Sequence, residues 1–501
     1  MNQPLRTLPD IEGLPHALYT AEQVRRMDRL AMQEFGLPSE ILMERAGSFA
    51  FDRIREQWPA ASDLTVLCGT GNNGGDGYVV ARLARAAGMN VRILQLGNPN
   101  AMQGAAAANA GRCAAEGLHA EMFHGLPAST DLIVDAMLGT GLDRSVGGLW
   151  AEAIESVNRH RAPVLSLDIP SGLNSDSGAI MGHAIEADVT TTFIALKRGM
   201  FTGDGPDCCG RVEFSSLDVP ARLYAAEILS ARRLDWRRQQ TYLQPRKATM
   251  HKGEAGHVLV IGGSPGFSGA ARLAGEAALR SGAGLVSIAT HPDHASFMNV
   301  GLPEIMCHAI ATPDQLDALV ERCDVIAIGP GLGRGAWGRE IFNALAESDR
   351  PVVMDADALG LLCGNHAGFR QRIMTPHPGE AARLLGVDAG QVQQERFAAA
   401  AKLQSLYGGT VVLKGAGTLV TSGDNRPPAV CSEGNPGMAT AGMGDVLTGV
   451  IAALLAQGLD SAVAAETGVA LHAAAADEAA KQGMRGMIAS DLFAPIRRLL
   501  G

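Results

Sequence analysis

Two glycine-rich loops, one towards each end of the chain, constrain the fold more than any other feature of the sequence. The first spans Gly69–Gly77 (GTGNNGGDG) and the second spans Gly434–Asp445 (GNPGMATAGMGD). Each follows a β-like segment, leads into a helix-like one and holds an aspartate at or beside its end. Glycines let backbone N–H groups approach a phosphate, and the N-terminus of the following helix adds partial positive charge. The sequence therefore predicts two anion-binding sites in two α/β domains.

Strand-like and helix-like runs alternate along most of the chain, which indicates parallel sheets with helices on both faces. In the first half the strand-like runs are 64–68, 91–96, 132–134, 164–167 and 189–195, with helix-like runs at 77–87 and 150–158. In the second half they are 257–261, 284–289, 325–328, 352–355, 373–375 and 410–413. Ahead of the first series, Thr20–Gln23 has the pattern of a capping box that opens a helical region reaching Trp58.

The periodic pattern weakens between Leu217 and Gly253, where charged and polar residues cluster. We therefore place a boundary near residue 235 and predict two domains, 1–235 and 236–501. The motifs of the two halves differ, so the second domain is not a repeat of the first. Each predicted domain is long enough to build its own core.

Composition favours some classes of function over others. The net charge of −10 and the aromatic content of 4% argue against a nucleic-acid-binding surface. The eight cysteines are scattered without a CxxC pair, so neither a zinc site nor a disulfide framework is expected. The N-terminal residues lack a secretory pattern, and no apolar run reaches the length of a membrane span. We expect a cytoplasmic protein that does not associate with membranes.

The first loop satisfies G-x-G-x-x-G with Gly69, Gly71 and Gly74, but the next strand lacks the acidic residue that holds a dinucleotide ribose. The segment Asn72–Asp76 is the more specific part, with a tight turn as the structural alternative. Asp135 and Asp168 then end two further strands. In a doubly wound sheet, Asn73, Asp135 and Ser171 would converge at the carboxyl ends of the strands. Oxygen ligands of this kind suit a hard cation, whereas helix capping would explain a lone aspartate equally well.

The motifs NNGGDG at Asn72–Gly77, Asp135 with Gly139–Gly141, and DIPSG at Asp168–Gly172 resemble those of the NAD(P)H-hydrate epimerase family, also called YjeF N-terminal. The resemblance runs from about Thr20 to Leu217. It implies an isomerase that interconverts the R and S forms of NADHX or NADPHX. It also implies a potassium ion at Asn73, Asp135 and Ser171 and an acid–base role for Asp168. The implied substrate residues are Asn72, Asn73, Gly74, Gly75, Asp76, Gly139, Thr140, Gly141, Leu142, Asp143, Arg144, Ser145 and Asp168.

The second loop precedes a clear helix, 446–455, and its backbone N–H groups could hold a transferring phosphoryl group. Asp445 stands where it could accept a proton from an attacking hydroxyl. The sequence has no Walker-type phosphate-binding motif. Lys414–Thr418 joins two strand-like runs as a hairpin and could wrap an adenylate. His377 follows a strand end, and we favour a ligand contact there over a buried structural histidine.

The second half is similar to the ADP-dependent NAD(P)H-hydrate dehydratase family, which has a ribokinase-like fold. The resemblance covers Pro245 to Leu500, although Met443 stands where the family commonly has threonine. It implies a lyase that converts the S hydrate and ADP into NAD(P)H, AMP and phosphate, with magnesium carried by the phosphates. The motifs that carry it are Gly262–Ser264, Gly269–Ala271, Gly329–Gly333, Asp355–Asp357, Thr375–Glu380, Lys414–Thr418 and Gly442–Asp445. The implied nucleotide residues are Lys414, Gly415, Ala416, Gly417, Thr418 and Gly444, and the implied hydrate residues are Ala270, Gly333, His377 and Asp445.

Together these observations predict an α/β protein with an N-terminal Rossmann-like three-layer domain followed by a ribokinase-like α/β domain. The hypothesis is a bifunctional metabolite repair enzyme whose ligands are NADHX or NADPHX, ADP, K⁺ and Mg²⁺, and which we expect to be a homo-oligomer. The alternative is a ribokinase-like kinase of a small alcohol with an N-terminal nucleotide-binding regulatory module.

Overall fold

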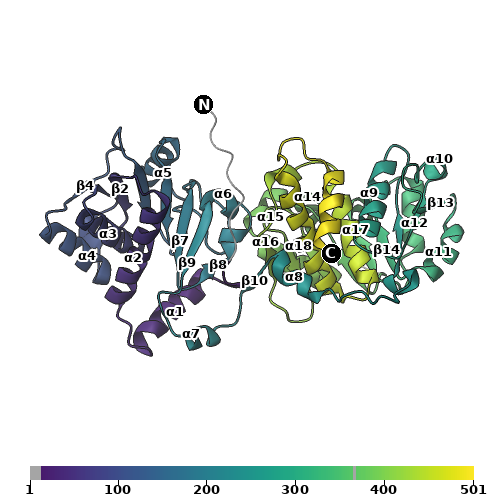
Figure 1. The fold of residues 1–501 in the computed structure, drawn as a ribbon, viewed down its shortest axis with the longest axis horizontal. Coiled ribbons are helices and arrows are strands. Elements are labelled where there is room, and N and C mark those ends of the chain that lie inside the picture. The colour runs from purple at the N-terminus through teal and green to yellow at the C-terminus, as the bar shows by residue number, and fades with distance from the viewer. Residues whose placement is uncertain (1–12, 365–367) are drawn as a thin grey trace. The chain divides into compact units, whose positions relative to one another are not determined.

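The computed structural model describes residues 13–364 and 368–501, and the chain divides into two compact units, Met1–Arg232 and Arg233–Gly501 (Figure 1). Each unit has its own hydrophobic cores, built from its own helices and strands. They are described in turn.

The first unit is built on a seven-stranded sheet in which neighbouring strands run parallel, in the order β4-β3-β2-β5-β6-β7-β9. The strand order reverses between β2 and β5, and this is where a crevice forms at the carboxyl ends of parallel strands. The strands are β2 (Asp63–Cys68), β3 (Asn90–Gln95), β4 (Ala120–Met122), β5 (Leu132–Ala136), β6 (Val164–Leu167), β7 (Val189–Phe193) and β9 (Arg211–Ser215).

Helices cover both faces of this sheet, which confirms the three-layer prediction. On one face lie α1 (Ala21–Gln33), α2 (Ser39–Gln57), α3 (Asn72–Ala86) and α4 (Gly104–Ala115), and on the other lies α5 (Leu149–Arg159). The capping box that the sequence predicts at α1 is present, because Thr20 Oγ1 accepts from Gln23 N at 3.3 Å and Gln23 Oε1 accepts from Thr20 N at 3.0 Å.

The predicted helix 77–87 begins five residues earlier than expected, at Asn72. The NNGGDG segment therefore forms the first turns of α3 rather than a loop. Its glycines permit close packing: a Cβ on Gly74 would lie 2.1 Å from the Gly69 carbonyl oxygen, and one on Gly77 would lie 2.6 Å from the Ala136 Cβ. Helix α3 can thus begin directly against the strand ends.

The predicted strand 189–195 also differs, because β7 ends at Phe193. Ile194 has a φ of +62°, which turns the chain into the short strand β8 (Leu196–Lys197). Strand β1 (Ala17–Tyr19) pairs with β8 in parallel and with β10 (Ala231–Leu234) in antiparallel fashion. The short helices α6 (Gly205–Cys209) and α7 (Arg222–Ala225) complete the unit.

In the second unit, nine strands follow one another in the order β13-β12-β11-β14-β15-β16-β17-β18-β19. They run parallel as far as β17, and β17, β18 and β19 are antiparallel. The hairpin predicted at Lys414–Thr418 is therefore present. The strands are β11 (His257–Ile261), β12 (Leu285–Thr290), β13 (Met306–Ala309), β14 (Val325–Ile328), β15 (Val352–Met354), β16 (Arg372–Met374), β17 (Thr410–Leu413), β18 (Leu419–Thr421) and β19 (Ala429–Cys431).

Helix α17 (Met443–Ala456) lies at the centre of this unit and packs against α9 (Ser268–Arg280) and α18 (Ser461–Ala480). Beyond its first turn, all of its residues but Thr448 are apolar, as expected of a helix enclosed by protein. The other helices are α8 (Trp236–Gln239), α10 (Pro292–Ala295), α11 (Asp317–Arg322), α12 (Ala336–Ala344), α13 (Ala356–Leu362), α14 (Pro378–Leu385), α15 (Ala389–Gln394), α16 (Arg396–Tyr407) and α19 (Phe493–Leu499).

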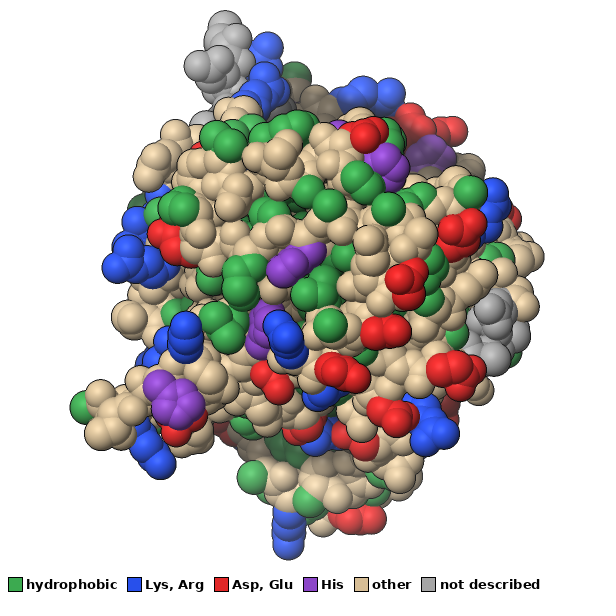
Figure 2. Space-filling view, turned by 90° about the vertical axis from the view of Figure 1, so that its right-hand side faces the viewer, with side chains coloured by type: hydrophobic (Ala, Val, Ile, Leu, Met, Phe, Trp, Pro, Cys, Tyr) green, Lys and Arg blue, Asp and Glu red, His purple; other side chains and the backbone are tan. Residues whose placement is uncertain are grey.

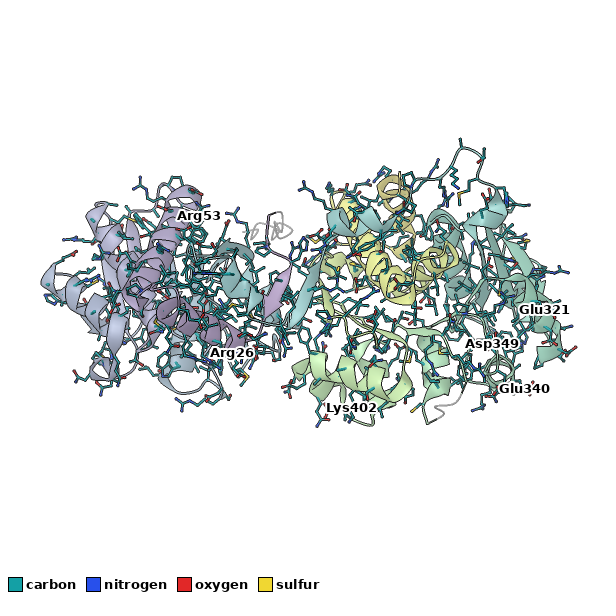
Figure 3. The ribbon with its side chains drawn as sticks, turned by 90° about the horizontal axis from the view of Figure 1, so that it is seen from below. Arg26, Arg53, Glu321, Glu340, Asp349 and Lys402 are labelled. Carbon is teal, nitrogen blue, oxygen red and sulfur yellow. The ribbon has the colours of Figure 1, made fainter. Side chains whose placement is uncertain are left out.

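Charged side chains of this unit extend outward from its peripheral helices. Figure 3 shows this for Glu321 on α11, Glu340 on α12 and Lys402 on α16, all of which are exposed. On the face drawn in Figure 2, lysines and arginines are dispersed among carboxylates and uncharged side chains. Within the described ranges, no helix is both long and apolar enough to cross a bilayer.

Candidate active sites

A cavity of about 730 Å³ opens in the first unit at the carboxyl ends of β2, β5, β6 and β7. Residues 70–73 line it after β2, residues 137–147 after β5, and Asp168 after β6. Of the predicted substrate residues, Asn72, Asn73, Asp76, Gly139, Thr140, Gly141, Leu142, Asp143, Arg144, Ser145 and Asp168 are in its lining. Gly74 and Gly75 lie behind it, packed against the Gly69 carbonyl and the Met43 side chain respectively.

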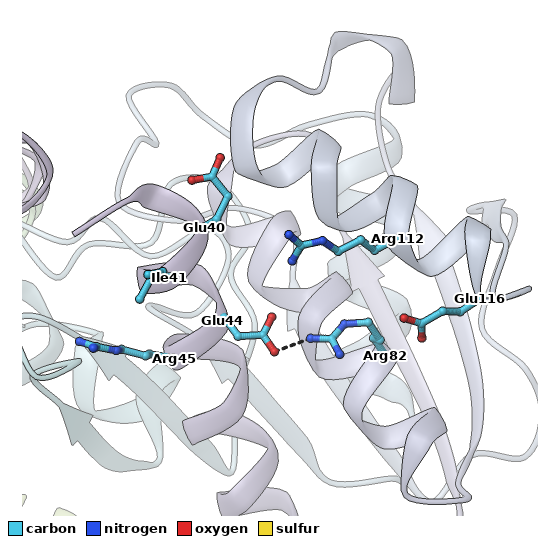
Figure 4. A pocket seen from close by; sticks show the side chains of 7 residues that line it. All are labelled: Glu40, Ile41, Glu44, Arg45, Arg82, Arg112 and Glu116. Carbon is cyan, nitrogen blue, oxygen red and sulfur yellow. Dashed lines mark hydrogen bonds and ion pairs between the residues drawn. The ribbon is translucent and has the colours of Figure 1, made fainter. Parts of the chain in front are cut away.

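A second cavity of about 460 Å³ lies among α2, α3 and α4 (Figure 4). One pair of its charged groups is in contact, since Arg82 donates to Glu44. None of the residues that the sequence singles out lines it. Its lining is Glu40, Ile41, Glu44, Arg45, Arg82, Arg112 and Glu116. The cavity at the strand ends is therefore the candidate site of this unit.

Asp168 stands at the floor of the candidate site in an ion pair with Lys197. The Lys197 ammonium is fully buried and donates to Asp168 Oδ1, to Thr192 Oγ1 at 2.8 Å and to the Phe193 carbonyl at 3.2 Å. Asp168 also has a φ of +64°, a conformation that residues with a Cβ seldom adopt. Backbone and ion pair together fix the carboxylate at the end of β6.

Sequence reasoning missed Lys197, although a signal was present. It is the only lysine in residues 1–232, and it follows the apolar run Phe193–Leu196. A lysine is almost never fully buried unless it is paired, so a lone one in a strand-like apolar run indicates a buried partner.

Besides Asp143 on the loop after β5, two carboxyl groups carried by helices line the same cavity, Asp28 on α1 and Asp76 on α3. Burial, followed by the charge of Asp168, raises the pKa of Asp28 to about 6, against the opposing charges of Lys197 and Arg29. Burial and the charges of Asp168 and Asp28 raise the pKa of Asp76 well above its usual value. The sequence prediction included Asp76 and missed Asp28, which stands inside an ordinary amphipathic helix.

The three predicted cation ligands come together around the Leu138 backbone. Ser171 Oγ donates to Asp135 Oδ1 at 2.5 Å and accepts from Leu138 N at 2.8 Å. Asn73 Nδ2 donates to the Leu138 carbonyl at 2.9 Å. Asn73 Oδ1 is buried without a hydrogen-bond partner in the described part of the chain. An orphaned amide oxygen beside a buried carboxylate and a hydroxyl is a donor set suited to a hard cation.

In the second unit, Asp445 lies in the first turn of α17. This turn directly follows Gly442, which has a φ of +89°. The turn stands close to two buried charges: a Cβ on Gly444 would lie 3.1 Å from Lys414 Nζ and 3.3 Å from Asp355 Oδ2. Burial and the charge of Asp355 raise the pKa of Asp445 to about 7, with Lys414 opposing the shift.

Lys414 links the predicted nucleotide hairpin to this carboxylate cluster. Its ammonium is 2.6 Å from Asp355 Oδ1 and 3.9 Å from Glu380 Oε2. Asp355 also accepts a hydrogen bond from Thr448 Oγ1 on α17 at 3.0 Å. Burial raises the pKa of Glu380 to about 7. The sequence alone did not predict a site role for Asp355, Glu380 or Thr448.

His377 is not a buried core residue. It caps α14, where its Nδ1 accepts from Gly379 N at 3.0 Å and from Glu380 N at 3.3 Å. Its side chain remains 52% exposed. Burial and the charge of Lys414 lower its pKa, which keeps the ring neutral and able to accept these bonds. Because the His377 ring is half exposed, it is accessible to a ligand, and the predicted ligand contact stays a prediction.

The fully buried Arg396 side chain binds the backbone of the hairpin Lys414–Thr418. One Arg396 nitrogen donates to the carbonyls of Leu413, Lys414 and Gly417 at 3.2–3.4 Å. Gly415 and Ala416 at the tip are exposed, and Thr418 Oγ1 donates to the Gly415 carbonyl at 3.0 Å.

The two remaining predicted hydrate residues, Ala270 and Gly333, lie near Gly331. A Cβ on Gly331 would lie 3.3 Å from the Ala270 Cβ. The Gly333 N–H donates to Asp357 Oδ2 at 3.0 Å. These contacts place both residues at the loop that follows β14.

Comparisons with known proteins also distinguish an N-terminal part of the chain from a C-terminal part. A family model described as YjeF-related protein N-terminus matches residues 39–199, and one described as NAD(P)H-hydrate dehydratase matches residues 258–498. The chain is 45% identical to the bifunctional NAD(P)H-hydrate repair enzyme Nnr of Coxiella burnetii, over 96% of this chain and 99% of that protein. Its identity to the protein of the same name from Escherichia coli is 44%, over 97% and 95%.

Among solved structures, a ribokinase-like superfamily protein from Enterococcus faecalis V583 aligns with a TM-score of 0.51 and 28% identity. The alignment covers 55% of this chain and 96% of that one. The prediction that the second domain has a ribokinase-like fold is confirmed.

Proposed function

The chain belongs to the family of bifunctional NAD(P)H-hydrate repair enzymes, and from this premise we propose how its two units divide the work. The first unit, an isomerase, interconverts the R and S hydrates of NADH and NADPH. The second, a lyase, dehydrates the S hydrate at the expense of ADP. The observation that carries the proposal is that an aspartate lies beside a glycine-rich segment near the ends of parallel strands in each unit, Asp168 in the first and Asp445 in the second.

In the first unit, Asp168 is the group we propose to exchange a proton with the hydrate. It is the only one of the predicted acid–base and metal residues that is both in the cavity lining and ion-paired within the described chain. The loop Gly139–Ser145 lines the same cavity and offers backbone N–H groups to the phosphates of the substrate.

The buried Asn73 Oδ1, which has no hydrogen-bond partner in the described part of the chain, supports a potassium ion in the first unit. The orphaned Asn73 Oδ1, the Ser171 hydroxyl and the Asp135 carboxylate are the residues that would hold it. The ion would supply a fixed positive charge held by Asn73, whose Cβ lies 3.3 Å from the Cβ position of Gly139. Asn73 thus connects the cation site to the wall of the substrate cavity.

In the second unit, Asp445 accepts the proton of the substrate hydroxyl. The hydroxyl oxygen then attacks the terminal phosphorus of ADP and AMP departs. Phosphate leaves next with the electrons of its bond to carbon, and loss of a proton from the neighbouring carbon restores the ring double bond. Backbone N–H groups at Gly442–Gly444 and the Lys414 ammonium stand where phosphate charge would be neutralised.

Magnesium would reach this site with the nucleotide. No group of three or more histidine, cysteine or carboxylate side chains suited to a metal occurs among the described residues. This supports a magnesium ion held by phosphate oxygens, with one or two carboxylates such as Asp355 and Glu380 nearby. None of the eight cysteines, all within the described ranges, forms a disulfide, which supports a reducing compartment such as the cytoplasm.

The test is recovery of reduced nicotinamide, followed by its absorbance, from mixed R and S hydrates with ADP, magnesium and potassium. We expect complete recovery with the unmodified chain. Asp168→Asn should recover the S fraction at the normal rate and slow the R fraction. Asp445→Asn should abolish recovery of both.

The outcome also separates this proposal from a kinase of a small alcohol. Release of AMP from ADP should occur only when the hydrate is present. ADP-independent recovery, or a rate for the R fraction that Asp168→Asn leaves unchanged, would contradict the assignment.

A further inference from the structure

The epimerase cavity holds more acidic groups than the proposed role of Asp168 requires. Asp28 on α1, Asp76 on α3 and Asp168 at the end of β6 line it together with Asp143 on the loop after β5. Of these four, Asp28, Asp76 and Asp168 interact electrostatically with one another. One cation, Lys197, is hydrogen bonded to Asp168. Three carboxyl groups around one buried cation cannot all ionise cheaply, so at least one of them is placed to carry a proton.

We propose that Asp28 is the second proton-carrying group of the epimerase site, working opposite the ion pair of Asp168 and Lys197. This inference rests on the proposed epimerase function and deepens it. Asp168 is then the group that starts as a carboxylate, and Asp28 the one that starts as a carboxylic acid.

The position of Asp28 distinguishes it from Asp76. Asp28 is partly exposed and lines the cavity beside Val24 and Arg25 on the same face of α1. Asp76 is only 9% exposed and is enclosed within the first turns of α3. A group that exchanges protons with a ligand must reach it, and Asp28 has the greater reach.

Burial of Asp28 first, and the charge of Asp168 second, favour its protonated form. The charge of Asp168 opposes its ionisation, and Lys197 and Arg29 assist it. Arg25, Asp143 and Arg144 line the cavity as well. Helix α7 packs against α1, and its Tyr224 hydroxyl donates to the Ile194 carbonyl at 2.6 Å. The resulting pKa of Asp28, about 6, lies close to the neutral range in which a general acid is most effective.

The chemistry needs such a pair of groups. Adding water across the enamine bond of a reduced nicotinamide places the hydroxyl on the carbon next to the ring nitrogen. The Asp168 carboxylate takes the hydroxyl proton, the oxygen forms a carbonyl, and the bond from that carbon to nitrogen breaks. The electron pair goes to nitrogen, which takes the proton of Asp28.

Rotation about the bond to the aldehyde carbon then presents its other face to the nitrogen. Nitrogen attacks that face, Asp28 recovers its proton, and the oxygen recovers the proton held by Asp168. The product is the opposite epimer, and both carboxyl groups are restored to their starting states.

The test is the pH profile of epimer exchange in the full-length chain, with the spontaneous rate subtracted. In the unmodified chain the rate should fall as the pH rises through about 6 and then by about tenfold per pH unit, because Asp28 loses its proton. Asp28→Asn should lower kcat by about 100-fold or more, leave KM nearly unchanged and remove this falling limb. Asp28→Glu should restore part of the rate together with the limb.

Control variants distinguish a role of Asp28 from a general effect of removing a carboxylate. Asp52→Asn, which removes an exposed carboxylate from α2, should behave like the unmodified chain. Normal exchange with a normal falling limb in Asp28→Asn, or loss of the limb in Asp76→Asn instead, would overturn the inference. Absence of exchange in the unmodified chain would overturn the proposed epimerase function itself.

Discussion

At the scale of single residues, Asp355 and Asp445 show how one lysine sets two opposite ionisation states. Burial alone would raise the pKa of Asp355, but Lys414 and the hydroxyls of Thr375 and Thr448 hold it below its usual value. Asp445 makes no such bonds among the described contacts, and burial with the charge of Asp355 raises its pKa to about 7. The pair thus supplies one permanent carboxylate and one carboxyl that can act as a base near neutral pH.

This difference predicts the pH dependence of the dehydratase. A base with a raised pKa is protonated and inactive at low pH, so kcat/KM should rise with pH and level off above about 7. Initial rates of NADH release from the S hydrate between pH 5 and 9, spanning about two units either side of that pKa, would measure it. Asp349→Asn, which alters an exposed carboxylate, should keep the profile, and a flat unmodified profile would exclude Asp445 as the base.

Lys197 allows a second prediction at this scale. Lys197→Met keeps the length and apolar stem of the side chain but removes the only recorded cationic partner of Asp168 in the described chain. Because the remaining carboxylate is partly buried and no longer paired, we expect epimer exchange to fall about 100-fold and unfolding to become easier by about 3 kcal/mol.

Exchange rates and denaturant unfolding would measure the two effects. Arg85→Met, which removes an exposed cation from α3, is the matched control. Equal exchange rates in the two variants would show that Asp168 works without its lysine.

At the scale of elements, both sites depend on how a helix begins. Helix α3 starts against the strand ends because Gly74 and Gly77 lack side chains. Helix α17 begins at Met443, directly after Gly442, whose left-handed backbone sets the course of the first turn past Lys414 and Asp355. The glycines of the two loops therefore serve packing and backbone direction together.

Gly442→Ala tests this for α17. The added Cβ would lie 2.6 Å from the Leu273 Cδ1, and alanine would have to adopt a φ of +89°. We expect a loss of about 1–2 kcal/mol in stability and a fall in dehydratase kcat of at least about tenfold, because the anion-binding turn shifts. Epimer exchange in the same preparation should remain normal, and an unchanged dehydratase rate would show that the turn tolerates the strain.

Arg396 supports the hairpin Lys414–Thr418 in a comparable way. Arg396→Met fills the same space but leaves the carbonyls of Leu413, Lys414 and Gly417 without this donor. The hairpin should become less ordered, and we expect the KM for ADP to rise several-fold with little change in the KM for the hydrate. Arg383→Met is a control on the neighbouring helix α14, and equal KM values for ADP in both variants would exclude a role of Arg396 in nucleotide binding.

At the scale of the whole molecule, each unit encloses its own cores and its own site. A substitution in one site should therefore leave the other site intact. Both hydrates and ADP are small enough to diffuse between molecules, so the two reactions need not occur in the same chain.

Mixing two defective variants tests this independence. Asp168→Asn retains the dehydratase and Asp445→Asn retains the epimerase, so an equal mixture should recover both epimers completely. Absorbance of the reduced nicotinamide would follow the recovery. If the mixture recovered no more than the S fraction, the two sites would have to cooperate within one chain.

The sequence by itself determined the two-domain α/β plan, because strand periodicity and glycine-rich segments are local signals. It also determined most of the residues that line the first cavity, since consecutive residues after a strand end share one edge of the sheet. Tertiary structure decided what those residues do. Lys197, Asp28 and Asp355 become important only because folding buries them beside Asp168 or Lys414, and the cost of burying a charge depends on neighbours that are distant in sequence.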